Sequence, residues 1–166
     1  YSLGHRKIAV IDGDLSRLSC IHRHESYMRG MLKHRLTLKN KWMAYGGIEE
    51  KTGYPAAKQL LEGCMDDLPT AVCANNDGVA FGVYRACAEL GLRIPEDISV
   101  VGMDARPEGK ITSPPLTSYA YDFHQLFSSL IYRVIDTIEE KPDVPQVEFF
   151  PGTLLCRGSC APPRTE

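Results

Sequence analysis

Apolar and polar positions alternate in blocks along the chain, and the blocks predict strands and helices in regular succession. Ile8–Ile11 is a continuous apolar run, typical of a strand buried on both faces. Short runs of the same kind predict further strands at Trp42–Tyr45, Thr70–Ala74, Ile98–Gly102, Leu116–Tyr121, Val147–Phe150 and Thr153–Arg157. Apolar residues at helical spacing predict helices over His22–Leu36, Thr52–Glu62, Asp77–Leu90 and Phe123–Glu140. This alternation predicts an α/β fold, a doubly wound parallel sheet with helices on both faces.

The stretch from Thr70 to Asp104 contains a complete strand, helix, strand unit. Asn76 or Asp77 can cap the helix, because a short side-chain oxygen accepts from a free amide of the first turn. Gly91 can end it in a left-handed conformation. The carboxyl ends of parallel strands meet at one edge, where open α/β sheets bind ligands. Four polar loops are expected to converge there: Gly13–Ser19, Gly46–Glu50, Asn75–Gly78 and Asp104–Arg106.

The helix predicted from Phe123 follows Asp122, which with Gln125 resembles a capping box. Its stripe of large apolar side chains is wide and must be covered by other residues. The stripe comprises Leu126, Phe127, Leu130, Ile131, Val134, Ile135 and Ile138. We expect this helix to pack against another copy of the chain or to fold back onto the sheet. The tail from Ala161 to Glu166 is expected to fray.

Composition limits the class of function. The chain has 166 residues and a formal charge of −2, with no run of Lys and Arg, so nucleic-acid binding by this chain alone is not expected. No apolar segment has the roughly 20 residues that a membrane span needs. The six cysteines form no C-x-x-C pair, and Cys73, Cys87 and Cys156 fall in predicted strands or helices, which favours a reduced, cytoplasmic compartment and no metal. Tyr1 stands where an initiator Met would, which indicates a chain cut from something longer.

A reaction centre is not indicated. His22 and His24 are two residues apart and diverge on a helix, so they do not predict a metal site. Asp14, Asp77 and Asp104 could form an acid/base set, but no nucleophile accompanies them. The glycine-rich, metalloprotease and hydrolase motifs are absent. We therefore expect a binding module without enzymatic activity or cofactor.

Several segments resemble the lactose/galactose-repressor family, in the right order and over nearly the whole chain. They are Leu3–Ala9, Asn76-Asp77 with Ala80 and Gly82, Glu89–Asp104, Pro114–Ser118 and Arg157–Ser159. The resemblance implies a bacterial transcriptional regulator in which a two-lobed, periplasmic-binding-protein-like domain senses a sugar or nucleoside-like effector. DNA would be bound only through a helix-turn-helix headpiece absent from this chain, and a homodimer is expected. The alternative is a solute-binding protein of the same fold, serving transport or chemosensing.

The resemblance also assigns parts of the chain. Residues 1–119 would form the second lobe, residues 120–145 would pack on the first lobe, which is mostly absent, and residues 146–166 would return to the second lobe. It implies that Asn76 and Asp104 hydrogen-bond the effector, and that other residues line its site: Arg23, Tyr27, Ile48, Tyr121 and Phe123.

Structural roles compete with these assignments. Asn76 and Asp77 are helix caps first, Asp104 could stabilise a turn, and Tyr27 and Ile48 could fill the core. Tyr121 and Phe123 could serve as hinge and packing residues. Val79, Val83 and Arg93 lie toward the family's dimer interface by resemblance, while a core or solvated role is equally compatible.

Overall fold

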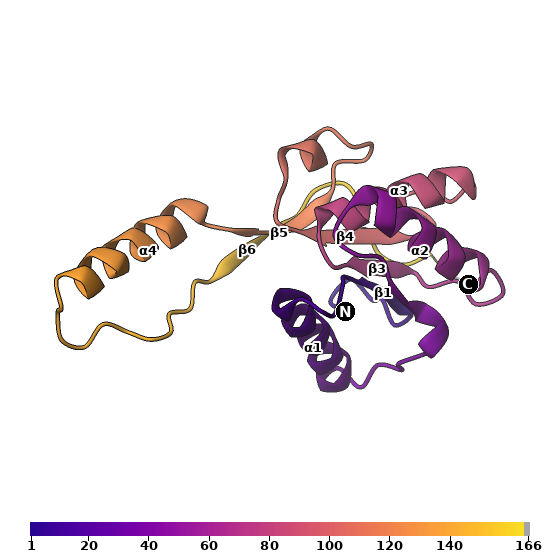
Figure 1. The fold of residues 1–166 in the computed structure, drawn as a ribbon. Helices are drawn as coiled ribbons and strands as arrows, with labels where there is room; N and C mark the ends of the chain where they lie inside the picture. The colour runs from indigo at the N-terminus through magenta and orange to yellow at the C-terminus, as the bar shows by residue number, and fades with distance from the viewer. Residues whose placement is uncertain (165–166) are drawn as a thin grey trace.

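The computed structural model describes residues 1–164 and confirms the α/β class (Figure 1). The strands are β1 (Ile8–Asp12), β2 (Met43–Tyr45), β3 (Ala71–Ala74), β4 (Ser99–Met103), β5 (Thr117–Tyr121) and β6 (Gly152–Leu155). The helices are α1 (Leu18–Lys33), α2 (Glu50–Glu62), α3 (Asp77–Glu89) and α4 (Phe123–Ile138), with short 3-10 helices at Asn40–Trp42 and Pro107–Lys110. The sheet order is β2-β1-β3-β4-β5-β6, and all neighbours are parallel except β6, which runs antiparallel to β5. Among the residues described, no helix is long and apolar enough to cross a bilayer.

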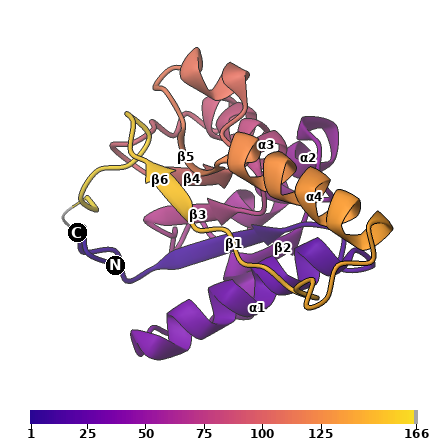
Figure 2. The ribbon, with the colours of Figure 1, turned by 90° about the vertical axis from the view of Figure 1, so that its left-hand side faces the viewer.

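The two faces of the sheet are covered unequally. Helices α2 and α3 lie on one face and α1 on the other (Figures 1 and 2). Val72 and Val100 point toward α2 and α3 and are fully buried with Val79 and Val83, which places the last two in the core and not at a surface. On the α1 side, Cys73 and Val101 are only half-buried. The continuous apolar strands therefore have one well-packed face and one that a single helix covers in part.

The predicted signals around α3 are confirmed. Asn76 is the N-cap, and its Oδ1 accepts from the backbone N–H of Val79 at 2.9 Å. Gly91 takes a φ of +69° directly after the helix, a conformation that costs glycine little. Asp122 caps α4, with its Oδ1 accepting from the N–H of Gln125 at 3.0 Å. Capping chemistry thus fixes these ends to within a residue.

Helix α1 begins at Leu18, four residues before the predicted start at His22. Its N-cap, Arg17, makes no side-chain capping bond, so the sequence carries no start signal there. Cys20, which is 1% exposed, belongs to the inward face that the prediction missed. The helix ends at Lys33 and not at Leu36, because Arg35 adopts a φ of 53° and breaks the repeat.

Three further predictions near strands were wrong. Trp42 lies in a 3-10 turn and not in β2, because its indole Nε1 donates to the carbonyl of Asp67 at 3.0 Å. Residues 147–150 form no strand and belong to the connection between α4 and β6. Strand β6 ends at Leu155, which leaves Cys156 exposed outside it.

The tail is held and does not fray at its start. Ala161 accepts from His5 Nε2 at 2.8 Å, and its N–H donates to Ser99 Oγ at 3.1 Å. Ser159 is fully buried and donates to the carbonyl of Val100 at 2.6 Å. These bonds tie the end of the chain to β4, while residues 165 and 166 of the predicted tail lie outside the described part.

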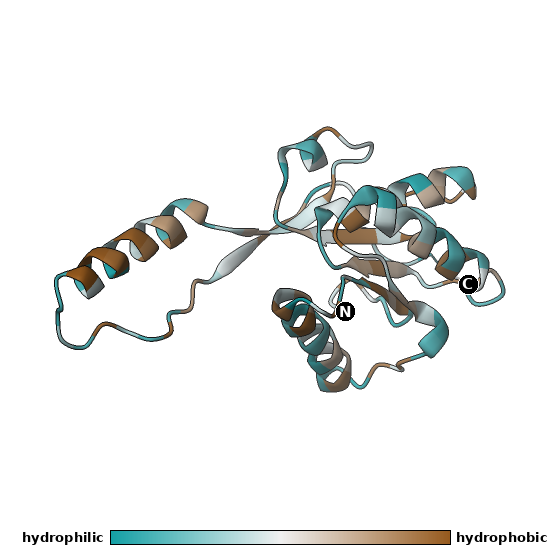
Figure 3. Cartoon of the chain, in the orientation of Figure 1, coloured by the Kyte–Doolittle hydropathy of each residue, from teal (hydrophilic) through white to brown (hydrophobic). Residues whose placement is uncertain are grey.

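Helix α4 stands apart from the rest. The β5–β6 pair carries it beyond the end of the sheet, and none of its residues is buried (Figures 1 and 3). The expectation that it folds back onto the sheet was therefore wrong. The alternative expectation, packing against another copy, stays a prediction.

Candidate functional site

Polar side chains follow three neighbouring strands at the carboxyl edge of the sheet. Asp12 ends β1, Asn75 follows β3 and Asp104 follows β4, so parallel pairing brings them to one edge, where the loops beginning at Asn75 and Asp104 were expected to converge. A hollow of about 670 Å³ opens between this edge and α1, which we call the edge hollow. Its polar lining is Asp12, Ser19, His22, Arg23, Ser26, Tyr27, Asn75, Tyr119 and Tyr121.

Arg23 connects three elements of the site. From α1, its guanidinium donates to the carbonyl of Asn75 at 2.9 Å and to Asp104 Oδ1 at 3.0 Å. The Arg23 and Asp104 side chains are about a quarter exposed, at 24% and 30%, so both charges stay within reach of a ligand. Because the two charges oppose each other, this part of the edge presents donors and an acceptor without a net charge.

The turn after β4 holds Asp104 in an uncommon backbone conformation. Asp104 has a φ of 104° and Ala105 a φ of 52°, positions that non-glycine residues rarely occupy. Ser118 Oγ accepts from the N–H of Ala105 at 3.0 Å and donates to Asp77 Oδ1 at 2.6 Å. The other oxygen of Asp77 accepts from the N–H of Arg106 at 2.7 Å. Asp77 thus fixes the turn that presents Asp104.

Asp77 itself is fully buried and lies beneath the turn, not in the hollow. Burial raises the pKa of the Asp77 carboxyl, and its bonds to Ser118 and Arg106 oppose this shift. Gly102 makes room for the carboxylate, since a Cβ there would lie 2.2 Å from Asp77 Oδ1. The predicted cap or effector residue is therefore a support for the site.

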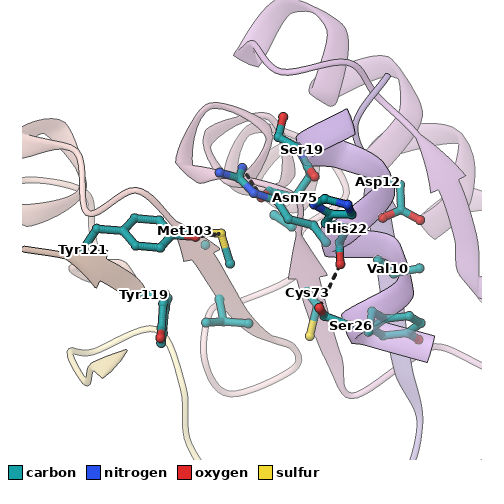
Figure 4. Close-up of a pocket in the computed structure, with 15 residues that line it drawn as sticks. Val10, Asp12, Ser19, His22, Ser26, Cys73, Asn75, Met103, Tyr119 and Tyr121 are labelled. Carbon is teal, nitrogen blue, oxygen red and sulfur yellow. Dashed lines mark hydrogen bonds between the residues drawn. The ribbon is translucent and has the colours of Figure 1, made fainter. Parts of the chain in front are cut away.

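Aromatic side chains form two walls of the edge hollow. The Tyr27 hydroxyl donates to the carbonyl of Ile8 at 2.9 Å, and burial raises the pKa of this phenol. Tyr121 stands opposite Asp12 and His22, next to Met103 (Figure 4), whose sulfur is a weak acceptor for the Tyr121 hydroxyl at 3.3 Å. The Tyr27 hydroxyl is committed internally, whereas that of Tyr121 can exchange a weak partner for a stronger one.

Three of the seven predicted site residues, Arg23, Tyr27 and Tyr121, line the edge hollow. Asp104 does not line it but is bound to Arg23, which does. The remaining three, Asn76, Ile48 and Phe123, neither line the hollow nor bind Arg23 by a hydrogen bond among those found in the described residues. The Asn76 side chain caps α3 and also donates to the carbonyl of Ile48 at 3.0 Å, so its polar atoms are already engaged. Phe123 begins α4 and stacks on Phe127, with ring centroids 6.1 Å apart.

Two polar residues of the hollow were not among the predicted site residues. Asp12 is 2% exposed and its Oδ2 lies 2.6 Å from His24 Nδ1, while burial raises the pKa of Asp12. Asn75 is 5% exposed, and its Oδ1 has no hydrogen-bond partner within the described residues. Both residues follow apolar runs directly, so the rule that selected Asp104 could have found them.

Arg93 lies away from this edge and is bound locally. Its guanidinium donates to both carboxylate oxygens of Asp97, at 2.9 and 3.0 Å, and the side chain is largely exposed. Of the two roles considered for Arg93, the solvated one therefore describes this residue in the single chain. In residues 1–164 no group of three or more His, Cys, Asp and Glu side chains is arranged to hold a metal ion.

The chain is similar to known proteins over nearly its whole length. Residues 1–160 match the family model described as periplasmic binding protein-like domain. The HTH-type transcriptional repressor PurR of Yersinia enterocolitica is 36% identical over 158 residues, which cover 95% of this chain and 46% of that repressor. The chain thus spans about half the length of the relatives it matches.

Two solved structures share the architecture across nearly the whole chain. A sugar-binding transcriptional regulator of the LacI family from Escherichia coli, complexed with phosphate, has a TM-score of 0.88 and 28% identity, and covers 98% of this chain and 57% of its own. The lac repressor dimer bound to operator and the anti-inducer ONPF has a TM-score of 0.89 and 28% identity, with coverages of 96% and 54%. The expected fold family is confirmed by these matches.

Proposed function

Because the chain belongs to the periplasmic binding protein-like domain family, we propose that it is the effector-sensing part of a DNA-binding transcriptional regulator. The observation that carries the proposal is the Arg23–Asp104 pair at the carboxyl edge, held by a strained turn that Asp77 and Ser118 support. A strained backbone conformation that buried side chains hold in place is typical of functional sites. The repressors and regulators among its relatives support this role over a solute-binding protein.

The chemistry of the edge favours an uncharged polar effector. Arg23 offers N–H donors beside the Asp104 carboxylate, an arrangement that matches a ligand with adjacent hydroxyls or a donor–acceptor ring edge. Tyr121 adds an aromatic surface next to them. A small sugar or a nucleoside-like molecule meets these requirements, and it would bind here without enzymatic turnover.

Regulation would follow from unequal affinity for two conformations. An effector that contacts the edge hollow more strongly in one arrangement of a two-lobed sensor shifts the population toward it, and so changes the affinity for DNA. DNA would be bound by a helix-turn-helix segment outside this chain, in a cytoplasmic homodimer. The free cysteines, Cys20, Cys64, Cys73, Cys87, Cys156 and Cys160, are compatible with that compartment.

The gene that encodes this chain provides the first test. We expect a helix-turn-helix segment in the same reading frame upstream of Tyr1. A secretion signal there, without a helix-turn-helix, would favour the solute-binding alternative.

Ligand binding by the whole gene product provides the second test. An effector present at 100 times its Kd stabilises the folded state by about 2.7 kcal/mol, which corresponds to a rise in Tm of roughly 5–11 °C for a domain of about 150–250 residues. Neutral sugars and purine nucleosides would be screened by thermal shift. Arg23→Ala and Asp104→Asn should abolish the shift, whereas Arg29→Ala, an exposed arginine on the same helix, should keep it. A full shift in both site variants would show that the edge hollow is not the effector site.

A further inference from the structure

Two oxygen acceptors of the edge hollow have no hydrogen-bond partner among the described residues. One is Asn75 Oδ1, while the amide Nδ2 of the same side chain donates to the sulfur of Cys20 at 3.6 Å. The other is Asp12 Oδ1, since the carboxylate bonds to His24 through Oδ2 and makes no other bond in the described part of the chain. Both side chains are almost fully buried, so bulk water does not compensate for the missing donors. A buried acceptor without a donor is costly, and both oxygens therefore require one.

The pairing of β1 with β3 places these two side chains next to each other. Ile11 lies opposite Ala74, so the residues that follow them are neighbours as well. In agreement with this register, the Asn75 N–H donates to the carbonyl of Ile11 at 2.9 Å. Ile11 and Ala74 belong to the core, and side chains alternate along a strand, so the next two side chains face α1 and line the edge hollow (Figure 4). Neighbouring strands lie about 4.8 Å apart, which lets one small group contact both Asp12 and Asn75.

Both side chains are buried by elements of this chain. Cys20 and His24, which bond to them, belong to α1. Asn75 also packs against Gly13, where a Cβ would lie 2.6 Å from the amide Nδ2. The burial of Asp12 and Asn75 therefore arises within β1, β3 and α1, and it does not depend on the part of the relatives' length that this chain leaves uncovered.

We propose that the effector carries an amino group, which donates one N–H to Asp12 and another to Asn75. The inference rests on the proposed function and narrows its class of effector. An amino group supplies at least two N–H donors, whereas a hydroxyl supplies one and would leave one acceptor unpaired. Two hydrogen bonds of about 2.9 Å from one nitrogen span about 5 Å, which matches the spacing of the strands.

The charges of the hollow accept such a group in either protonation state. Arg23 is bound to Asp104, so this pair is neutral, whereas the Asp12 carboxylate has only the imidazole of His24 as its partner. A protonated amine on a sugar and a neutral amine on a nucleobase both supply the two donors. The shared chemistry is the amino group, and the two sources are separated by experiment.

Matched ligand pairs test the inference on the whole gene product. Glucosamine is compared with glucose, galactosamine with galactose, and adenosine with inosine, by calorimetry. We expect the amino member of at least one pair to bind about 10-fold or more tightly than its partner, because the partner leaves a buried acceptor without a donor. A preference in a sugar pair identifies an amino sugar, and one in the nucleoside pair identifies an amino-substituted base.

Two variants locate the contact. Asn75→Leu removes one acceptor at nearly constant volume and should reduce the preference for the amino member by about 10-fold. Asn40→Leu, the same change at an exposed position outside the hollow, should keep the preference. Asp12→Asn retains an oxygen for His24 and turns an N–H toward the hollow, so it should remove the preference as well. Circular dichroism establishes that each variant is folded.

The outcomes separate this inference from the proposed function. Equal binding of both members of a pair, lost in Arg23→Ala, would overturn the amino-group inference and leave the proposed function in place. A full preference for the amino member in both Asn75→Leu and Asp12→Asn would also overturn it. If none of the six compounds bound, the effector class proposed for the edge hollow would be wrong, and the amino-group inference with it.

Discussion

Replacing Asp77 by alanine removes the two acceptors that hold the turn presenting Asp104. The Ser118 hydroxyl and the Arg106 N–H, at 2.6 and 2.7 Å, would then point at a space that Gly102 leaves empty. Bonds to a charged acceptor contribute about 1.5–3 kcal/mol each. Part of this loss in stability is offset, because the substitution also removes a carboxylate that burial disfavours. We therefore expect Asp77→Ala to lower the free energy of unfolding by about 2–4 kcal/mol at pH 7.

The assay is urea unfolding followed by circular dichroism, with Ser118→Ala as the comparison. Ser118→Ala removes one donor and leaves Asp77 bound to Arg106, so its effect should be smaller, about 1–2 kcal/mol. An Asp77→Ala effect below about 0.5 kcal/mol, the usual size for an unremarkable surface change, would refute the role assigned to this network.

The pH dependence provides an independent check on the same carboxyl. Burial raises the pKa of Asp77 in the folded state above its unfolded value, so folding takes up a proton at this site. The stability that Asp77 contributes is fully present below its unfolded pKa, near 3.9, and declines as pH rises through the folded pKa. The difference between wild type and Asp77→Ala should therefore shrink as pH increases from about 4 to 7. If the difference instead grew with pH, the hydrogen-bond donors would affect the pKa of Asp77 more than burial does, and the pKa would be lowered in the folded state.

Three further predictions concern single positions. Gly102→Ala should lower the free energy of unfolding by about 1–3 kcal/mol, because the added Cβ would collide with the Asp77 carboxylate. Gly30 lies on α1 with open space around it, so Gly30→Ala should raise that free energy by about 0.5–1 kcal/mol, and thermal denaturation should show a lower Tm for the first variant and a higher Tm for the second. Tyr27→Phe should cost about 1 kcal/mol of unfolding free energy through the lost bond to Ile8 and should leave effector affinity within a few-fold, measured by calorimetry. Ser159→Ala should cost about 1–3 kcal/mol in urea unfolding, since it leaves the buried carbonyl of Val100 and the N–H of Thr117 without this hydroxyl.

Sequence patterns predicted those parts of the fold whose causes are local. The apolar runs gave the strands from Ile8 to Tyr121, and the side chains of Asn76 and Asp122 gave the starts of α3 and α4. Predictions failed where the cause lies far along the chain. The first turn of α1 contains Cys20, which is buried and whose sulfur accepts from Asn75 Nδ2 at 3.6 Å, 55 residues away. The turn at Trp42 depends on the carbonyl of Asp67, 25 residues away. Neither contact leaves a local signal.

The loop after β3 shows why site residues are harder to predict than elements. Asn75, Asn76 and Asp77 are consecutive, polar and equally close to the carboxyl edge, so the rule of strand ends treats them alike. The backbone separates them: Asn76, with a φ of −153°, turns its side chain back to cap α3, and Asp77 enters the helix and points beneath the next strand. Asn75 alone lies against the hollow, with one amide atom unpaired among the described residues. The orientations of the Asn76 and Asp77 side chains are thus set by the start of α3, and a rule based on strand ends alone does not contain this information.

For helix α4 the sequence predicted the exposed residues well but not the surface that covers them. The sequence predicted its apolar stripe and the need to cover it, and six of the seven predicted side chains are exposed in the structure: Phe127, Leu130, Ile131, Val134, Ile135 and Ile138. A stripe of this kind specifies how much surface must be removed from water but not which surface removes it, because the hydrophobic effect has no direction. The structure adds that the β5–β6 pair carries α4 beyond the end of the sheet, so the sheet of the same chain does not cover the stripe.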